Sequence, residues 1–210
     1  MFETALVAFT TFFATVGPAN LAALFAALTH DNTAAERKAM ARKASLIGGG
    51  VLLFFTILGE SVIATFGISL AALRTAGGIL LLLIAIDMVF ARPSGGTTTT
   101  EEENVEAAER KDLSVFPLAT PLIAGPGAIG AAILLGAGAT GDPARLAVVV
   151  GALLANIVLC YVLMLMATQV QKVLGVTGLQ VLTRIVGILL AALAVQFVFD
   201  GIATSGLLPE

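Results

Sequence analysis

The 210-residue sequence has little charge: Asp, Glu, Lys and Arg make up 12% of it, against 58% hydrophobic residues. Soluble domains carry about 25% charged residues, so this composition excludes a water-facing surface over most of the chain. The mean hydropathy of +1.02 points the same way, and the apolar residues must face lipid or one another. We therefore expect a protein whose main partner is the lipid bilayer, and we expect no nucleic-acid partner.

Residues that carry enzyme chemistry are also scarce. The chain has one cysteine, Cys160, and one histidine, His30. A lone cysteine excludes an intramolecular disulfide or a two-cysteine thiol relay, and inside an apolar run it is expected to be a small packing residue. The sequence has no serine–histidine pair, no His-Glu-x-x-His motif and no two carboxylates flanking one membrane depth. We expect no enzyme, no metal and no cofactor.

The sequence is rich in apolar runs long enough to cross a bilayer, which takes about 20 helical residues. The first run lacks the basic segment and cleavage site of a signal peptide, so we expect it to stay as a span of the mature protein. Barrel strands would alternate over about 10 residues, whereas these runs are continuous and rich in Leu and Ala. The sequence predicts an all-α, polytopic membrane helix bundle with six spans, at residues 3–28, 45–66, 71–90, 115–138, 144–168 and 180–203.

The loops between these spans differ in positive charge. Nine Lys and Arg residues fall on one side of the predicted bundle, and two, Arg74 and Arg145, fall on the other. Cytoplasmic loops retain positive charge, so the bias predicts a multi-pass protein of the inner (cytoplasmic) membrane with both termini outside. The cytoplasmic loops would be residues 29–44, 91–114 and 169–179.

Two halves of the chain resemble each other. Residues 67–90 match residues 175–200, and Gly17-Pro18 in span one matches Gly125-Pro126 in span four at a similar offset. Because each half has an odd number of spans, the second copy enters the membrane upside down, as in the inverted repeats of secondary transporters. The first comparison pairs Arg74 with Arg184 and Gly77 with Gly187.

This repeat divides one integral membrane domain into three segments. Residues 1–90 form the N-terminal three-span repeat, and residues 115–210 form the inverted C-terminal repeat. Residues 91–114 include a run of Gly, Thr and Glu with no apolar periodicity. We interpret them as a flexible cytoplasmic linker.

The two Gly-Pro pairs predict helix breaks near the middle of spans one and four. A proline inside a helix removes one backbone donor and clashes with the preceding turn, but it is favoured at the first position of a new helix. Each pair would therefore start a half-helix whose free amides and partial positive charge suit a carboxylate. The carbonyl groups before each break suit an ammonium group or a cation. The alternative interpretation is that both pairs only kink the helices for packing.

Candidate site residues follow from these breaks. The candidates for substrate binding are Thr15, Gly17, Pro18, Ala19, Asn20, Thr120, Pro121, Gly125, Pro126, Gly127 and Asn156. The threonine hydroxyls could instead bond to their own helix, and the amide of Asn156 could bond to a neighbouring helix. Ionisable groups within the membrane are functional suspects, so Glu60 and Asp87 are candidates for ion or proton coupling. Glu60 could alternatively reach headgroups or pair with Arg74.

Several of these motifs together resemble the MarC family of bacterial and archaeal membrane proteins. The resemblance covers nearly the whole chain and implies six spans, an inverted repeat and, for characterised members, transport of glycine- or alanine-sized amino acids. Span one here reads Gly-Pro-Ala-Asn, where many relatives carry a motif such as Asn-Pro-Ile-Gly-Asn. The matching motifs are Phe13-Ala-Thr-Val-Gly-Pro-Ala-Asn, Phe66-Gly-Ile-Ser-Leu, Arg74-Thr-Ala-Gly-Gly-Ile-Leu-Leu, Thr120-Pro-Leu-Ile-Ala-Gly-Pro-Gly-Ala-Ile and Gly178-Leu-Gln-Val-Leu-Thr-Arg-Ile-Val-Gly.

The sequence thus predicts a secondary transporter of small neutral amino acids that works by alternating access, with its substrate near the midplane at the two breaks. The alternatives are a non-transporting membrane scaffold or assembly partner, and a channel for small polar solutes. The coupling ion, proton or sodium, stays open, and so do the direction of flux and the formation of a homo-oligomer.

Overall fold

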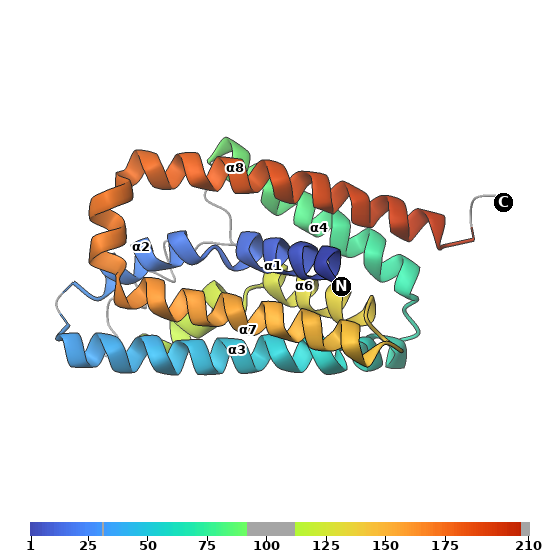
Figure 1. Cartoon of the computed structure of the whole chain (residues 1–210), viewed down its shortest axis with the longest axis horizontal. Helices are drawn as coiled ribbons and strands as arrows, with labels where there is room; N and C mark the ends of the chain where they lie inside the picture. The colour runs from blue at the N-terminus through green and yellow to red at the C-terminus, as the bar shows by residue number, and fades with distance from the viewer. Residues whose placement is uncertain (31, 92–111, 207–210) are drawn as a thin grey trace.

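The computed structural model of the chain describes residues 1–30, 32–91 and 112–206, and these are helical with short connections. Figure 1 shows an elongated bundle in which most helices run along the long axis. The elements are α1 (Phe2–Val16), α2 (Pro18–Leu28), α3 (Ala34–Thr65), α4 (Leu70–Phe90), η1 (Ser114–Ile123), α6 (Pro126–Ala137), α7 (Pro143–Leu165) and α8 (Ala167–Ala203).

The expectation of an α-helical membrane bundle is confirmed. Five stretches are long and apolar enough to cross a membrane, with α1 and α2 together forming the first, and the bent pair η1–α6 brings the number to six. The described residues contain no β-strand. The predicted linker 91–114 falls mostly on residues 92–111, which lie outside the described part of the chain.

Residues 34–44, within the predicted cytoplasmic connection 29–44, are helical and form the start of α3. Thr33 caps the helix: its Oγ1 accepts from the backbone N of Glu36 at 3.3 Å, and its own N–H donates to Glu36 Oε2 at 2.8 Å. This capping box gives the helix a start well before its apolar part. The first turns of α3 therefore carry a basic cluster outside the apolar span, made of Arg37, Lys38, Arg42 and Lys43.

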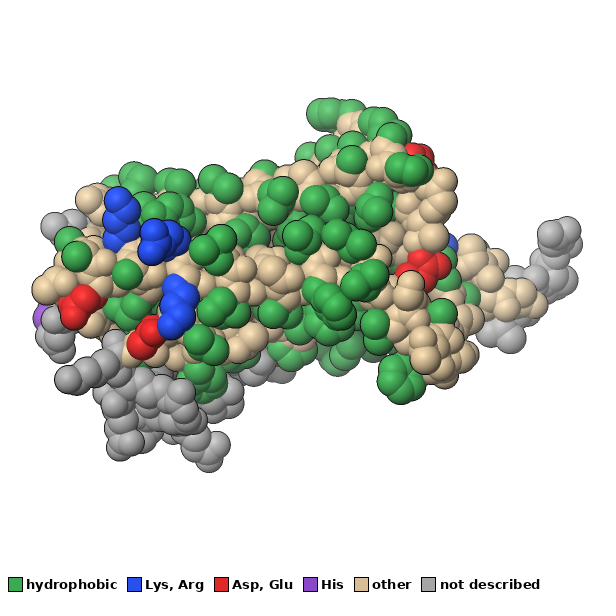
Figure 2. Space-filling view, turned by 90° about the horizontal axis from the view of Figure 1, so that it is seen from below, with side chains coloured by type: hydrophobic (Ala, Val, Ile, Leu, Met, Phe, Trp, Pro, Cys, Tyr) green, Lys and Arg blue, Asp and Glu red, His purple; other side chains and the backbone are tan. Residues whose placement is uncertain are grey.

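We call the end of the bundle that carries this basic cluster the basic end, and the other the far end. Figure 2 shows Lys and Arg side chains gathered near one end of the α3 face and hydrophobic side chains over its middle. Helices α2, α4 and α7 finish toward the basic end, and α4 and α7 begin at the far end (Figure 1). An apolar band between two polar ends is the surface expected of a membrane-spanning bundle.

Residues 169–179, the third predicted cytoplasmic connection, are helical and belong to α8. One residue, Met166, separates α7 from α8, and the chain turns there and again within α8 at Gly175, which has φ 58° and ψ −175° (Figure 1). Glycine adopts such a positive φ at little cost because it has no Cβ. The first part of α8 thus forms an arm across the basic end, and residues from Thr177 onward run back along the bundle (Figure 1).

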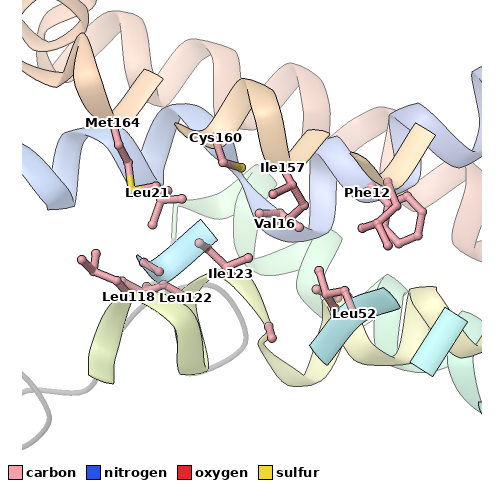
Figure 3. Packing of buried hydrophobic residues seen from close by; sticks show 14 of the residues in the cluster. Phe12, Val16, Leu21, Leu52, Leu118, Leu122, Ile123, Ile157, Cys160 and Met164 are labelled. Atoms are coloured by element: carbon pink, nitrogen blue, oxygen red, sulfur yellow. The ribbon is translucent and has the colours of Figure 1, made fainter. Parts of the chain in front are cut away.

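The core lies where helices of the two predicted halves interleave. Helix α3 packs on η1 and α6, α7 packs on α1 and α2, and α4 packs along most of α8. Figure 3 shows the larger buried cluster, with side chains of the first span between those of α7 and η1. The labelled members are Phe12, Val16, Leu21, Leu52, Leu118, Leu122, Ile123, Ile157, Cys160 and Met164.

Two glycines bring the backbones of α4 and α8 into contact. A Cβ on Gly78 would lie 2.7 Å from the carbonyl oxygen of Ala194. A Cβ on Gly187 would lie 3.2 Å from the carbonyl oxygen of Ala85. The two contacts are reciprocal, since the sequence separation from Gly78 to Gly187 equals that from Ala85 to Ala194. Gly78 and Gly187 thus make equivalent contacts, whereas the sequence comparison aligns Gly187 with Gly77.

Candidate functional site

The first span is interrupted at Gly17, as the sequence predicts. Gly17 has φ 60° and ψ 59°, a left-handed conformation that ends α1, and Pro18 is the first residue of α2. The Gly17 N–H donates to the carbonyl of Phe13 at 3.0 Å, and its carbonyl accepts from Leu21 at 2.9 Å. Because Pro18 has no N–H, the carbonyl of Ala14 loses its normal helical donor. The break therefore exposes acceptors on one side and helix N-terminal donors on the other.

The fourth span is interrupted more widely. Within η1, Phe116 and Thr120 have extended backbones, and each precedes a proline through a cis peptide bond. Gly125 then caps α6, which begins at Pro126 and is bent by 56° from η1. Both predicted breaks are thus present, with different local geometries.

A small cavity lies beside the first break. Its volume is about 20 Å³, which is room for about one water molecule. Two polar side chains meet in its wall, where Thr183 Oγ1 of α8 donates to Asn20 Oδ1 of α2 at 3.1 Å. The lining residues are Phe13, Gly17, Pro18, Ala19, Asn20, Met88, Leu182, Thr183 and Val186.

A larger cavity of about 240 Å³ lies next to this one, toward the basic end. It is lined by residues near the end of α4 and the bend of α8, including Ala91, Gly175 and Gln180. Asn20 and Thr183 line both cavities. The hydrogen bond between these two side chains therefore stands at the boundary between the small cavity at the break and the wider one.

The second break is covered by α4. A Cβ on Gly127 would lie 2.3 Å from Ile84 Cδ1, so this isoleucine sits on the first turn of α6. Gly125 and Gly127 are buried and Pro126 is exposed. Between the two breaks the packing is apolar, and Figure 3 shows Val16 and Ile123 across from one another. The structure does not bring the two half-helix N-termini into one open cavity.

The other predicted substrate-binding residues have partners of their own. Thr15 Oγ1 donates to the Thr11 carbonyl at 2.8 Å, and Thr120 Oγ1 donates to the Val115 carbonyl at 3.3 Å. Pro121 lies half-buried inside η1. These contacts agree with the alternative that the two threonine hydroxyls bond to the backbone of their own helix.

Asn156 connects α7 to α1. Its Nδ2 donates to the carbonyls of Phe9 at 3.2 Å and Ala152 at 3.1 Å. The side chain is fully buried, and its Oδ1 has no hydrogen-bond partner in the described structure. Asn156 therefore bridges two helices, and its amide oxygen stays unsatisfied.

The two coupling candidates do not line the cavities beside the first break, although Asp87 is next to Met88, which lines the small one. The Glu60 carboxylate accepts a hydrogen bond from Thr140 Oγ1, which lies between α6 and α7 at the far end, instead of pairing with Arg74. Asp87 is half-buried one turn before the end of α4. Neither residue lines the cavity at Gly17.

Thr183 is the site residue that the sequence reasoning missed. It belongs to the motif Gly178-Leu-Gln-Val-Leu-Thr-Arg, but its position opposite Asn20 depends on how α8 packs on α2. The only feature in the sequence that could have pointed to Thr183 is its hydroxyl group, which lies within an otherwise apolar span. A residue of this kind is a site candidate only once its neighbours are known.

The fold defines a polytopic α-helical integral membrane protein with an interrupted first span. The model of the family described as "MarC family integral membrane protein" matches residues 2–205. The chain belongs to the MarC family.

Relatives match over almost their full length. UPF0056 membrane protein YvbG of Bacillus subtilis (strain 168) is 36% identical, over 96% of this chain and 95% of the relative. UPF0056 membrane protein MJ1677 of Methanocaldococcus jannaschii is 37% identical, over 94% and 95%. UPF0056 membrane protein YhcE of Escherichia coli (strain K12) is 36% identical, over 90% and 87%. No solved structure matches the chain.

Proposed function

We propose that this protein is a secondary transporter of small neutral amino acids, of the size of glycine or alanine, that binds its substrate at the break between α1 and α2. The observation that carries the proposal is the left-handed break at Gly17-Pro18 beside a cavity whose wall contains Asn20 and Thr183. The proposal contains no catalytic step. The partners are the amino acid and the lipid bilayer.

The chemistry of the break fits a zwitterion. The first amides of α2, at Ala19 and Asn20, precede the first internal helical donor, Leu21, and a helix N-terminus favours a carboxylate. The carbonyl groups that end α1 and the Asn20 Oδ1 atom are acceptors for an ammonium group. The apolar side chains of Met88 and Val186 limit the room for the substrate side chain. A cavity of about 20 Å³ is smaller than any amino acid, so the substrate enters when the contact of α8 with α2 opens.

The packing supports an inverted repeat. In the two predicted halves, α1 and α2 correspond to η1 and α6, α3 corresponds to α7, and α4 corresponds to α8. The contact of α3 with η1 and α6 then has its counterpart in the contact of α7 with α1 and α2. Exchange of the two halves leaves the α4–α8 contact unchanged and swaps Gly78 with Gly187. Inverted repeats allow a transporter to open alternately to the two sides. We therefore propose alternating access with residues 1–90 and 115–210 as the two repeats.

The charge distribution supports an orientation in the inner membrane. The cluster at Arg37, Lys38, Arg42 and Lys43 lies at one end of the bundle, and cytoplasmic ends retain positive charge. We propose that the basic end faces the cytoplasm and that both termini lie outside.

One observation favours the alternative of a non-transporting scaffold. The interior between the two breaks is packed with buried apolar side chains, including Val16 and Ile123. A scaffold would keep this packing permanently, whereas a transporter would open it on at least one side during its cycle. The two functions thus differ in a measurable way.

The direct test is uptake of labelled glycine and alanine by proteoliposomes, with and without an imposed pH or sodium gradient. A transporter gives saturable uptake that unlabelled glycine inhibits and that one of the gradients accelerates. Flux that rises without saturation indicates a channel. Absence of flux in both gradients, from protein that is monodisperse and correctly inserted, contradicts the transport proposal.

Variants at the break test the site separately. The double variant Gly17→Ala, Pro18→Ala restores the missing N–H and removes the glycine that ends α1, so the two helices can join and uptake should be lost. Asn20→Ala should lower uptake at least about tenfold, since a ligand contact through charged groups is worth about 1.5–3 kcal/mol. Thr65→Val, at an exposed threonine that bonds within α3, is the matched control. Unaltered uptake in both break variants would contradict the proposed binding site at the break but not the proposed transport function.

A further inference from the structure

A further, wide cavity is separate from the break. It has a volume of about 630 Å³ and lies at the far end, where α4 and α7 begin and α6 and α8 finish around the first turns of α1. It shares no residue with the cavity at Gly17. Its floor is formed by the buried residues Leu134, Leu135 and Val149, so it penetrates into the bundle.

Side chains of both charge signs line this cavity. Arg74 and Arg145 supply two guanidinium groups, and Glu3 and Asp200 supply two carboxylates. These four side chains form no ion pair with one another, although they surround one space. Arg74 is half-buried, unlike Arg184, which is exposed on α8. Within the residues that the structure describes, these charges of opposite sign are unpaired and leave a dipolar space for a ligand.

One of the carboxylates is held in place. Gln196 Nε2 donates to Asp200 Oδ1 at 2.8 Å, within the last turns of α8. In the described part of the chain no hydrogen bond occupies Asp200 Oδ2, so this oxygen is available to a donor from a ligand. The neighbouring Leu193 and Phe197 give the cavity an apolar wall on the same helix.

We propose that this cavity is a second binding site, selective for a zwitterion that carries a carboxylate and an ammonium group. A guanidinium group binds a carboxylate through two parallel hydrogen bonds, which assigns the carboxylate to Arg74 with Arg145. The ammonium group then bonds to Asp200 and Glu3. A ligand with one charge would neutralise one side of the cavity and leave the other unpaired.

The identity of the ligand as a free amino acid rests on the proposed transport function. In that setting the site is a vestibule that gathers the amino acid at the far end before it reaches the break. A cavity of this volume accepts larger side chains than the space at Gly17, so the vestibule would be less selective for size than the break. A phosphatidylethanolamine headgroup offers the same pair of charges and is the competing source of this chemistry.

Equilibrium binding to the full chain in phosphatidylglycerol nanodiscs tests the proposal, and each measurement is repeated with Asn20→Ala to separate alanine bound at the break from alanine bound in the cavity. Labelled alanine is the probe, and unlabelled propionate and ethylamine, which each retain one of its charges, are competitors. Alanine should bind at least about tenfold more tightly than either competitor. Arg74→Gln should weaken alanine binding at least about tenfold, so that the affinity for alanine approaches that for ethylamine. Asp200→Asn should lower the affinity for alanine toward that for propionate.

Arg184→Gln is the matched control and should leave alanine binding unchanged. Arg74→Lys keeps the charge but loses the two parallel hydrogen bonds, so its affinity for alanine should lie between those of the wild type and Arg74→Gln. An intermediate affinity would also show that the loss in Arg74→Gln does not come from misfolding. Equal alanine affinity in the wild type, Arg74→Gln and Asp200→Asn would overturn the proposal. Loss of alanine binding in nanodiscs that contain phosphatidylethanolamine would overturn the amino acid as the ligand and assign the site to the headgroup.

Uptake measured on the same variants separates this proposal from the transport function. Binding that depends on Arg74 without any uptake by proteoliposomes would leave the cavity site standing and remove transport. Uptake that is unaffected by Arg74→Gln, together with unchanged binding, would remove the cavity site and leave transport. An absence of alanine binding by the wild type would overturn the cavity site directly.

Discussion

Thr183 of α8 donates a hydrogen bond to Asn20 of α2 across the boundary between two cavities, at an Oγ1 to Oδ1 distance of 3.1 Å. The smaller cavity is beside the interrupted backbone of the first span, and the larger one is nearer the basic end. Thr183 Oγ1 also lies 2.8 Å from the carbonyl of Leu179 in its own helix. The single hydroxyl proton of Thr183 is therefore shared between an acceptor in α8 and an acceptor in α2.

Thr183→Val should loosen this contact with little change in side-chain volume. A net hydrogen bond is worth about 0.5–1.5 kcal/mol, so the open fraction should rise about two- to tenfold. In an Ala19→Cys background, the rate of maleimide labelling reports the opening, since Cys160 is buried and the wild type should not react. Thr65→Val should leave the labelling rate unchanged, and an equal rate in Thr183→Val would show that the bond does not limit access.

Gly78→Ala should destabilise the protein, whereas Gly77→Ala should be tolerated. The added methyl group at position 78 would meet the backbone of Ala194 and Val198 at 2.7 and 2.9 Å, but at position 77 its nearest neighbour is Leu134 Cδ2 at 3.5 Å. Overpacking of this kind costs about 1–3 kcal/mol. Thermal unfolding in detergent should show a lower midpoint for Gly78→Ala only. Equal midpoints would mean that α4 and α8 lie further apart than the structure shows.

The Asp112–Lys43 pair predicts a pH-dependent contribution at the basic end. The hydrogen bond from Lys43 Nζ at 2.7 Å, followed by those from Ser114, lowers the pKa of the Asp112 carboxyl from 3.8 to about 2. A lowered pKa gives stability that is present above about pH 4 and is lost as the pH falls toward 2. Both side chains are about half exposed, so Asp112→Asn should cost at most about 1 kcal/mol.

Denaturation of the wild type and Asp112→Asn, followed from pH 6 to pH 2, checks this sign. The difference in stability should be largest near pH 6 and should fall to a small fraction of that value by pH 2, because the folded-state pKa is about 2. A difference that stays the same from pH 6 to pH 2 would show that the ionised carboxyl is not its source.

The proposed orientation can be tested with single cysteines, because the natural Cys160 is fully buried. Lys38→Cys places an exposed thiol at the basic end, and Ala144→Cys places one at the far end on the first turn of α7. In intact cells, a membrane-impermeant maleimide should label Ala144→Cys and should label Lys38→Cys only after the membrane is opened. The reverse pattern would contradict the orientation drawn from the positive charges.

The spans and the two breaks could be predicted because each has a local cause. Apolar run length sets a span, and a Gly-Pro pair interrupts a helix wherever it occurs. The capping box at Thr33 and Glu36 was also visible in the sequence, but hydropathy alone placed the start of the helix in the apolar part. The helical first part of α8, which follows α7, was not predicted, because hydropathy only places residues 169–179 between two apolar runs and says nothing of their backbone conformation.

The site residues were harder to predict, since most depend on contacts between segments far apart in the chain. Asn20 was a candidate from its position after the first break, whereas Thr183 becomes one only when α8 is packed on α2. The charged cavity has the same origin: Arg74 and Asp200 are separated by much of the sequence and meet through the α4–α8 pairing. The contact of α8 with Gly78 instead of Gly77 could not be predicted, because sequence similarity does not show which face of a helix is in contact.

The backbone contacts at Gly78 and Gly187 constrain how α4 and α8 can move relative to each other. Helices α4 and α8 run in opposite directions, and the two contacts are reciprocal. A slide of one helix along the other would therefore disturb both contacts together and by equal amounts. The pair has a single favoured register, so any large displacement should carry α4 and α8 as one rigid body past the interrupted first span.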